Sequence, residues 1–487
     1  MYRKNIILSI IFLLTITFIY AQVPNQINPD FLKAIQNQDE GLKGEVEVGG
    51  IPYPVKLGFD AYQSRNTTDL PSLFDLRGTG VLPPVKTQSS GGCWAYSSMS
   101  TVESRMLVLG QGLYNLSDNN LKYCHEFFPS RSTNGNAWMA TAYFARQSGP
   151  LLEEQDPSPG GTSAPGVDCP VGEAPAFLVR DSRYPPGDMN TIKQLIMDVG
   201  SIWSLIYYNA TYFNAVENTY FYGGTQEVNH VFNIVGWDDN KVTDGGVGAW
   251  ICQNTYGTGW GEDGFVYTSY NVSQFLIYNA YFPNYEEYTD DSRVLLYDEL
   301  GNYSSYGYES EEGYALVKYE VTENLTIDKI GTYAMAYGTE IEMSIYSSFD
   351  PLTGSLSYQI GQVSTKTTEH PGLYTYSLDE PISVNMGNEL YIKVKYTTPS
   401  YNWPIPVEMY LETYSDPYIE SGVAWISGTG IEGDWLAVGD DTDYKIDLCV
   451  NVYGAYNPNP VPLSNNIIIV IIFGLLAIVS IRMFLKK

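Results

Sequence analysis

Apolar residues recur at helical spacing in the stretch that follows Cys93. Trp94, Val102 and Met106 fall on one side of a helix, and Gly110 can end it. The run LSDNNLKYC (116–124) has an N-cap serine with a polar residue three positions later, which predicts a second helix start. Residues 137–147 and 191–200 have the composition of two further helices. The part of the chain from Cys93 to residue 200 is therefore predicted to contain several helices.

The pattern changes to strands after residue 200. The segments SIWSLIYY (201–208), HVFNIVGWDD (230–239), GAWICQNTY (248–256) and GFVYTSY (264–270) are rich in β-branched and aromatic residues. Helices followed by strands predict an α+β domain, which we place at residues 71–284. Residues 22–70 are polar and turn-rich, and we interpret them as an extended pro-segment or N-terminal extension.

Strict alternation of apolar and polar residues dominates residues 285–456. YALVKYEV (314–321), IEMSIYSS (341–348) and ELYIKVKY (389–396) place an apolar residue at every second position, and turn residues such as DPLTG and NMGN separate such runs. This pattern is typical of an all-β antiparallel sandwich.

Both ends of the chain are apolar. Residues 1–21 have the charged start, apolar core and small-residue end of a secretory signal peptide, with an uncleaved anchor as the alternative. Residues 457–487 combine a Pro/Asn linker with an apolar run and a basic tail, typical of a transmembrane or sorting segment. These features predict an exported protein held at a cell surface or membrane. The sequence leaves open whether the C-terminal segment is retained or removed.

Charge and cysteine content narrow the function. The chain carries 55 acidic against 26 basic residues, a net charge of −29, so it would repel phosphates and nucleic acid is not expected as a partner. Five cysteines in an exported chain leave at least one without an intrachain partner. We expect neither a cofactor nor a metal.

A free cysteine at a helix start suits a nucleophile. Gly91-Gly92 leads into Cys93, where a helix N-terminus lowers the pKa of a thiol. The chain has only three histidines, and His230, which leads into an apolar strand, is the best base candidate. Asn254 follows another strand and supplies an amide that can orient the imidazole, with Tyr256 and Trp260 close by in sequence.

These motifs resemble the papain family of cysteine peptidases. The similarity rests on DLRGTGVLPPVKTQSSGGCWAYS (75–97), LSDNNLKYC, NHVFNIVGW (229–237) and QNTYGTGWGEDGF (253–265), in the family's order. It implies that Cys93 is the nucleophile, His230 the base, Asn254 its orienting group and Gln88 an oxyanion donor. It also implies a disulfide between Cys124 and Cys169.

The sequence departs from the family pattern close to the nucleophile. Four residues rather than five separate Gln88 from Cys93, and both halves of one family disulfide are missing. The shorter loop puts the placement of Gln88 in question. Residues expected to line the substrate cleft are Asn134, Gly135, Trp138, Tyr256 and Trp260.

Residues 285–456 resemble the lectin-like domain of bacterial and archaeal papain-like peptidases. LYDELGNYSSYGY (296–308) and SGVAWISGTGIEGDWLAV (421–438) carry the resemblance, and GGIPYPVKLGFDAYQSRNTTDLPSLFDLR (49–77) resembles the segment before their protease domain. Tyr401, Trp403, Trp425 and Trp435 could stack on a glycan, although the core of the sandwich is the favoured position.

We therefore expect a surface-anchored cysteine endopeptidase acting on polypeptides. The alternatives are a catalytically inactive adhesin or carbohydrate-binding protein with a peptidase fold, and a transpeptidase that shares the chemistry.

Overall fold

The computed structural model describes residues 22–38, 49–64, 70–88, 91–127, 134–158 and 169–459. The predicted signal peptide and the apolar run at residues 467–481 lie outside the described residues. Within the described ranges, no helix is both long and apolar enough to cross a membrane.

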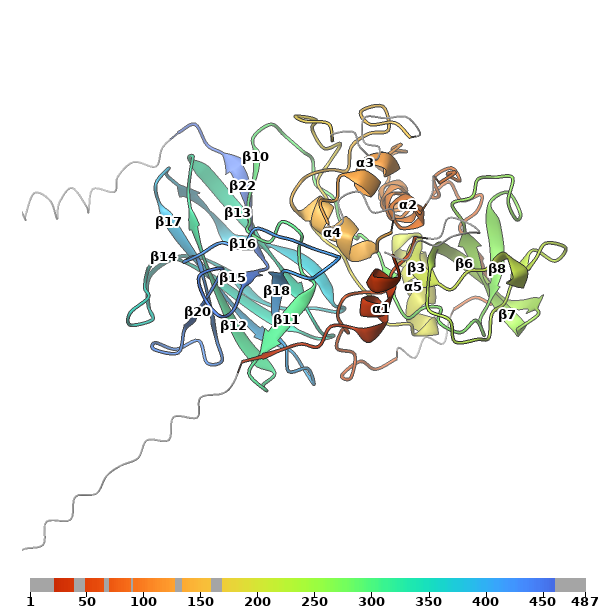
Figure 1. The fold of residues 1–487 in the computed structure, drawn as a ribbon. Coiled ribbons are helices and arrows are strands. Elements are labelled where there is room, and N and C mark those ends of the chain that lie inside the picture. Colours follow the sequence, from red (N-terminus) through yellow and green to blue (C-terminus); the bar gives the residue numbers. More distant parts are fainter. Residues whose placement is uncertain are drawn as a thin grey trace, which may run out of the picture.

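The helical part and the first sheet occupy the right-hand half of Figure 1. The helices are α1 (Pro29–Gln38), α2 (Cys93–Val108), α3 (Asp118–Tyr123), α4 (Ala137–Ala145), α5 (Met189–Val199) and the 3-10 turn η1 (Ala210–Tyr212). The strands are β2 (Leu73–Asp75), β3 (Ile202–Ile206), β4 (Phe213–Asn214), β5 (Thr219–Tyr220), β6 (His230–Thr243), β7 (Gly246–Gln253), β8 (Phe265–Ser269) and β9 (Asn279–Ala280). They form one sheet of order β4-β5-β8-β7-β6-β3-β9, with β2 beside β6.

Local sequence signals set the helix starts. Ser117 caps α3 by accepting a hydrogen bond from the amide of Asn120, as the sequence predicts. Asn136 caps α4 in the same way through two amides. Helix α2 is almost wholly buried between the other helices and the sheet, which explains why its apolar pattern carries so many small serines.

Helix α1 corrects the expectation that residues 22–70 are extended throughout. Phe31 and Ile35, one turn apart, are both buried, and Leu32 and Ala34 beside them are partly buried against the same core. The apolar face covers little more than one turn of a short helix, so packing against the rest of the chain decides the conformation.

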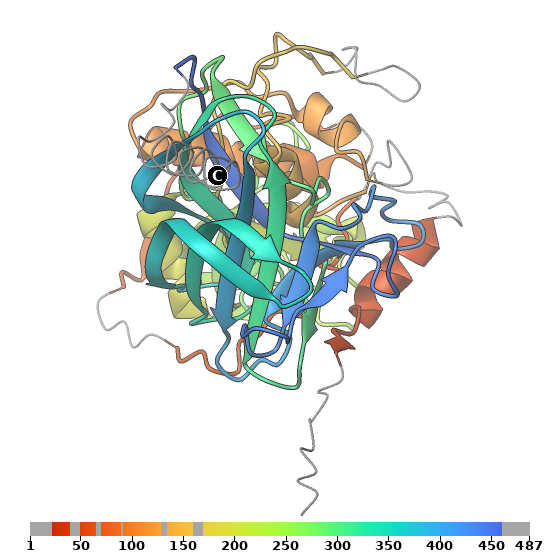
Figure 2. The same cartoon turned by 90° about the vertical axis from the view of Figure 1, so that its left-hand side faces the viewer.

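The second half of the chain is the antiparallel sandwich at the left of Figure 1, seen face on in Figure 2. Its strands are β10 (Ser292–Leu295), β11 (Ser304–Gly307), β12 (Glu312–Glu320), β13 (Leu325–Ala334), β14 (Glu340–Asp350), β15 (Ser355–Thr367), β16 (Gly372–Val384), β17 (Glu389–Thr397), β18 (Ile405–Met409), β19 (Ala424–Ser427), β20 (Leu436–Val438), β21 (Ile446–Leu448) and β22 (Val450–Tyr456). One sheet has the order β15-β14-β17-β12-β19-β20, another β10-β22-β13-β16, and β11, β18 and β21 lie in a third.

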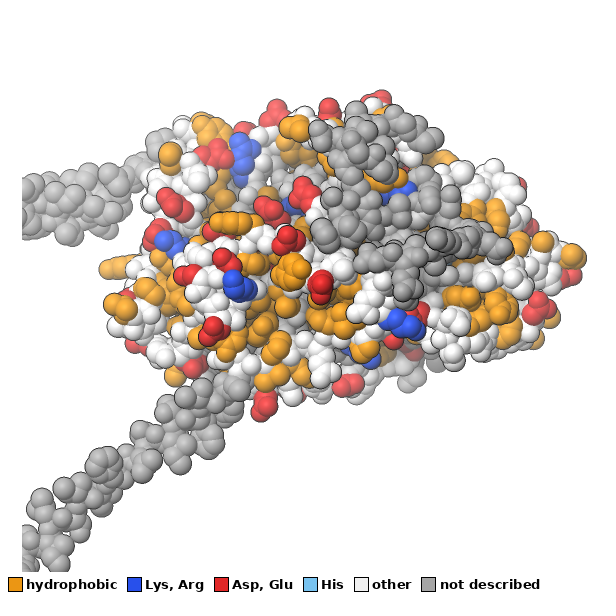
Figure 3. Space-filling model, in the orientation of Figure 1, with side chains coloured by type: hydrophobic (Ala, Val, Ile, Leu, Met, Phe, Trp, Pro, Cys, Tyr) orange, Lys and Arg blue, Asp and Glu red, His pale blue; other side chains and the backbone are white. Residues whose placement is uncertain are grey.

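Alternation along these strands matches the prediction. In β14, Ile341, Met343 and Ile345 are buried while the residues between them face outward. Tyr401 and Trp425 are buried, as the core interpretation expects. Acidic side chains are scattered over the surface in Figure 3 and basic ones are few, in line with the net charge of −29.

The two halves are joined by buried contacts as well as by the chain. Arg183, from the helical half, pairs with Asp181 and lies over the ring of Tyr374 in the sandwich, 3.3 Å from its centroid. The backbone amide of Ser182 donates to the carbonyl of Leu373 in β16. The expected α+β domain followed by an all-β sandwich is therefore confirmed, and the halves pack closely together.

The N-terminal segment contacts both halves. Strand β1 (Val23–Pro24) pairs antiparallel with β11 of the sandwich, and α1 follows it at the junction in Figure 1. Residues 49–51 then cross the helical half beside Cys93, and residues 56–58 return to the sandwich.

Candidate active site

Cys93 lies at the first turn of the buried helix α2. Gly92 is the N-cap and Gly91 has a positive φ of 65°, so the glycines turn the chain sharply into the helix. The amides of Trp94 and Val231 both hydrogen-bond to the Cys93 sulfur, which lowers the pKa of the thiol. The sulfur thus lies at the junction between α2 and the start of β6.

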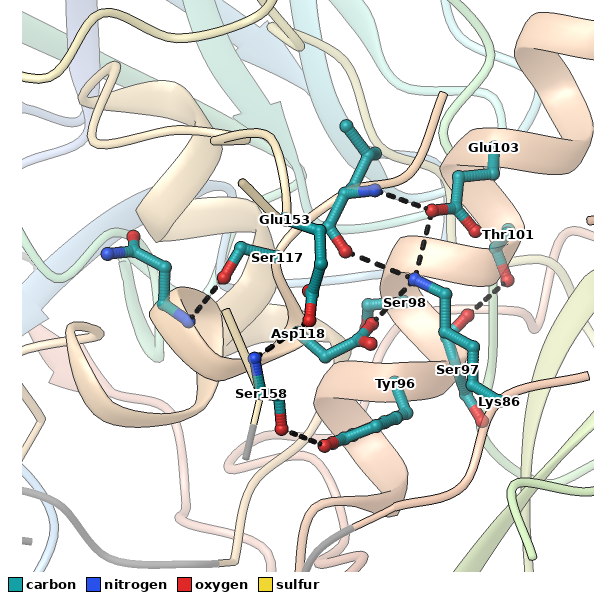
Figure 4. Close-up of polar contacts among 12 residues, drawn as sticks. Lys86, Tyr96, Ser97, Ser98, Thr101, Glu103, Ser117, Asp118, Glu153 and Ser158 are labelled. Carbon is teal, nitrogen blue, oxygen red and sulfur yellow. Dashed lines mark hydrogen bonds and ion pairs between the residues drawn. The ribbon is translucent and has the colours of Figure 1, made fainter. Parts of the chain in front are cut away.

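A buried lysine ties the chain before Cys93 to the helices. Lys86 Nζ lies 2.9 Å from the carboxylates of both Glu103 and Asp118 and donates to the carbonyl of Leu116 (Figure 4). Glu103 also accepts from the amide of Leu116. Because Lys86 precedes Gln88 by two residues, this network fixes the segment that carries Gln88 against α2 and α3.

His230 begins strand β6 and is fully buried. Its Nε2 lies 2.9 Å from Oδ1 of Asn254, which also accepts from the amide of Thr255. Since an amide oxygen only accepts, Nε2 carries the proton and Nδ1 is the basic nitrogen. Among the described residues, Nδ1 has no hydrogen-bond partner. The His230 ring is therefore in the tautomer whose Nδ1 can take a proton, and the next residue, Val231, hydrogen-bonds to the Cys93 sulfur.

Aromatic rings cover the histidine–asparagine pair. Tyr256 stacks on the His230 ring at 5.0 Å between centroids, and Trp260 meets the edge of Tyr256 at 5.9 Å. Tyr208 approaches His230 from another side at 5.4 Å, a neighbour that the sequence did not point to. The only sign of this neighbour in the sequence was its position as the second of two tyrosines at the end of the apolar segment SIWSLIYY.

Gln88 is placed beside the asparagine segment despite the short loop. Its amide donates to the carbonyl of Thr255 at 2.7 Å, and Thr87 bridges Tyr256 in antiparallel register. The hydroxyl of Thr255 donates to Oε1 of Gln88. This bond fixes which end of the side-chain amide is the oxygen, so the NH₂ group points away from Thr255.

Residues 49–51 of the N-terminal segment lie against the residues around Cys93. The Gly50 amide donates to the Asn229 carbonyl at 2.9 Å, the Ile51 amide to the Gly135 carbonyl at 3.0 Å, and the Gly135 amide to the Gly49 carbonyl at 2.8 Å. The Gly49 backbone also hydrogen-bonds to the Cys93 sulfur.

Glycine is needed on both sides of this contact. A Cβ on Gly49 would lie 1.9 Å from the Gly91 oxygen, one on Gly50 2.5 Å from Leu205, and one on Gly135 2.4 Å from Trp94. This contact was not predicted from the sequence, in which the paired glycines were a weak signal for it.

Burial under this segment keeps the reactive pair neutral. Burial raises the pKa of the Cys93 thiol to about 12, against the lowering by its amide contacts. Burial also lowers the pKa of His230 to about 4, although Asn254 raises it slightly. The covered site therefore holds a thiol and a neutral imidazole at neutral pH.

An aromatic box lies at the far end of the cleft and holds Tyr53. Its ring lies 5.7 Å from Trp138, 5.2 Å from Tyr184 and 5.1 Å from Tyr278 between centroids. Its hydroxyl donates to the carbonyl of Asn279 at 2.9 Å.

The other predicted site residues are also placed. Asn134 directly precedes Gly135 at the cleft wall and is half-buried. Cys124 and Cys169 form a disulfide with a Cα–Cα distance of 5.9 Å, while Cys93 is a free buried thiol. The structure thus places His230 on Asn254 and Gln88 on the neighbouring Thr255, while the residue after His230 contacts the Cys93 sulfur. Gly135 bonds to residues 49–51, and Trp138 lies beside Tyr53.

The fold and this cleft define a papain-like cysteine protease. A family model described as papain family cysteine protease matches residues 70–282, and one described as lectin like domain matches residues 294–454. Residues 70–282 are therefore a papain-family cysteine protease domain, and residues 294–454 are a lectin-like domain.

Individual relatives agree with this assignment. Peptidase 1 of Euroglyphus maynei is 24% identical over 253 residues, which cover 50% of this chain and 71% of that protein. Cathepsin K of Gallus gallus is 27% identical over 209 residues, or 42% of this chain and 60% of that protein. The chain therefore spans less than two thirds of the cathepsin, and the similarity covers about half of the chain.

Solved structures extend the likeness to both domains. The cysteine protease and lectin-like domains of Cwp84, a surface layer associated protein of Clostridium difficile, superpose with a TM-score of 0.74 at 20% identity, covering 90% of this chain and 98% of that one. Cwp84 after propeptide cleavage gives a TM-score of 0.68 at 21% identity, covering 80% and 100%. At these identities the likeness establishes the fold.

Proposed function

We propose that the protein is an exported, surface-anchored cysteine endopeptidase that hydrolyses peptide bonds with Cys93, His230 and Asn254. The observation that carries the proposal is the protonated Nε2 of His230 on Asn254, which leaves Nδ1 free to act as a base, together with the Val231 backbone contact to the Cys93 sulfur. Export and anchoring rest on the predicted terminal segments and on Cwp84, a surface layer associated protein of the same fold.

In this mechanism Cys93 gives its proton to Nδ1 of His230, and the thiolate attacks the carbonyl carbon of the substrate. The new S–C bond moves an electron pair onto the carbonyl oxygen, which the Gln88 amide and the Cys93 backbone N–H stabilise. Collapse breaks the C–N bond, and His230 returns the proton to the leaving amine. Water, deprotonated by His230, then hydrolyses the thioester and restores the thiol.

We propose further that residues 22–70 are a pro-segment that blocks the cleft until it is cut near Leu70. The hydrogen bonds of residues 49–51 exclude a substrate from the same groove, and burial keeps Cys93 and His230 neutral. Removing the segment exposes both groups to water, so the pKa of the thiol falls and that of the imidazole rises.

The box around Tyr53 suggests one feature of the substrate. Once Tyr53 leaves, three aromatic rings and the carbonyl of Asn279 line a space that fits a phenol ring. We propose that the mature enzyme prefers an aromatic side chain at this subsite, which a peptide-library cleavage profile tests. Glycan binding by Tyr401 or Trp425 is not part of the proposal, because both are buried.

A second candidate is an adhesin whose peptidase domain is inactive, and the occupied cleft is the observation that favours it. An epoxide inhibitor of papain-like enzymes discriminates the two when it is added under reducing conditions after the segment has been removed. Labelling at Cys93, lost in Cys93→Ser, supports the peptidase. Wild-type protein that stays unlabelled and cleaves no protein substrate would contradict it.

A further inference from the structure

The lectin-like domain binds the N-terminal segment on both sides of the part that crosses the cleft. Upstream, β1 pairs with β11, the amide of Asn25 donates to the carbonyl of Ser305 at 2.8 Å, and Tyr444 donates to Gln22. Downstream, the amide of Gly58 donates to the carbonyl of Met335 at 3.0 Å. The segment is therefore attached to the sandwich before and after it passes Cys93.

One hydroxyl group joins the two attachments. The hydroxyl of Tyr401 accepts from Nδ2 of Asn25 at 2.7 Å and lies 3.2 Å from the carbonyl of Lys56, to which it donates. The Tyr401 ring also lies against Gly58, where a Cβ would approach it to 2.7 Å. Tyr401 was a candidate for sugar stacking in the sequence. In the structure its side chain is buried and hydrogen-bonds to the N-terminal segment instead.

The two arms of the segment, residues 22–28 and 54–58, also pair with each other. Ile27 bridges Val55 in antiparallel register, and the amide of Asn28 donates to the carbonyl of Pro54 at 2.8 Å. Between these arms, Gly49 and Gly50 contact the protease domain through their backbone alone, because they have no side chains, while the side chain of Ile51 is buried. Side chains of the segment also bond to the protease domain, as Tyr62 and Ser64 do to Asp188, and the sandwich adds the contacts at Tyr401.

We infer that the lectin-like domain is a regulatory clasp that holds the pro-segment over Cys93. This inference rests on the proposed function, because it concerns when that nucleophile becomes accessible. Releasing the clasp at Tyr401 frees both arms together, and residues 49–51 then leave the cleft more often. The strength of the contacts between the lectin-like domain and the segment thus sets the rate at which Cys93 becomes accessible.

Tyr401→Phe in the full chain tests the clasp, because it removes one hydroxyl and keeps the ring. Tyr418→Phe, at a tyrosine of the same domain that is 76% exposed, is the matched control. Hydrogen exchange is measured by mass spectrometry on the peptide that contains residues 49–55, and Cys93 labelling by the epoxide is timed in parallel under reducing conditions.

Loss of two hydrogen bonds predicts about 30-fold faster exchange and labelling in Tyr401→Phe, and no more than about a twofold change in Tyr418→Phe. Exchange in β16 should be unchanged, which shows that the sandwich remains folded. Gly58→Ala, which forces a Cβ onto Tyr401 and Ala336, should open the segment further.

The readouts separate this inference from the proposed function. Faster exchange at residues 49–55 in Tyr401→Phe supports the clasp, whether or not Cys93 is labelled. Absence of labelling in every variant would count against the peptidase and leave the clasp standing. Exchange equal to that of the wild type and of Tyr418→Phe refutes the clasp, whatever the labelling shows.

Discussion

Substituting Gly49 by alanine should open the protease without any processing. The added Cβ would lie 1.9 Å from the carbonyl oxygen of Gly91, about 1.5 Å closer than ordinary van der Waals contact. Gly91 is part of the turn that leads into α2 and has little freedom to move, so the segment must move instead.

The size of the effect follows from the bonds that this movement breaks. Residues 49–51 make three backbone hydrogen bonds to the cleft, at 2.8 to 3.0 Å. At about 1 kcal/mol for each bond, the covered state loses about 3 kcal/mol, which raises the open fraction about 100-fold.

The assay is the rate of epoxide labelling of Cys93 in the uncut full chain, followed by intact mass. Gly259→Ala is the control, because a Cβ there meets no atom within 4 Å. We expect about 100-fold faster labelling in Gly49→Ala and an unchanged rate in Gly259→Ala. Equal rates in both variants, with unfolding temperatures near that of the wild type, would refute the placement of the segment over Cys93.

Three further outcomes are expected. Thr255→Val removes the hydroxyl that orients Gln88, so kcat/KM of the mature enzyme should fall about tenfold at an unchanged unfolding temperature and recover in Thr255→Ser. Lys86→Met leaves two buried carboxylates without their cation and should lower the free energy of unfolding by about 3–5 kcal/mol in denaturant titrations, whereas Lys33→Met at an exposed pair should leave it almost unchanged. In the covered state, burial lowers the pKa of His230 to about 4. The contact of residues 49–51 with the site is therefore most stable above the ordinary histidine pKa near 6.5, and it weakens as the pH falls towards 4. Hydrogen exchange at residues 49–55, corrected for its intrinsic pH dependence, should therefore be faster at pH 4.5 than at pH 7, and an unchanged corrected rate would contradict this linkage.

The covered cleft and the lectin-like domain together describe a protease whose chemistry is restrained in two ways. The segment blocks the groove sterically, and its burial of Cys93 and His230 favours their uncharged forms. Both restraints are removed by the same movement, because the backbone atoms that fill the groove are those that exclude water from the pair. The proposed clasp at Tyr401 would place control of that movement in the other domain.

The sequence by itself determined the class of protein. Helix α2 could be predicted because its apolar spacing and the glycines before it are local signals, and the strands of the sandwich because alternation has a period of two. The chemistry of Cys93, His230 and Asn254 could be predicted because each needs a particular residue type at a particular place in the local pattern.

Only the tertiary structure decided how the N-terminal segment is used. Gly49-Gly50, Tyr53 and Asn25 lie in a stretch with no strong period, and they have partners as far as 376 residues away in the chain. Helix α1 was missed for the same reason, since so short an apolar face forms a helix only when a surface is present to bury it. Close backbone contact and a single buried hydroxyl leave almost no trace in composition or spacing, so they emerge only when the chain is folded.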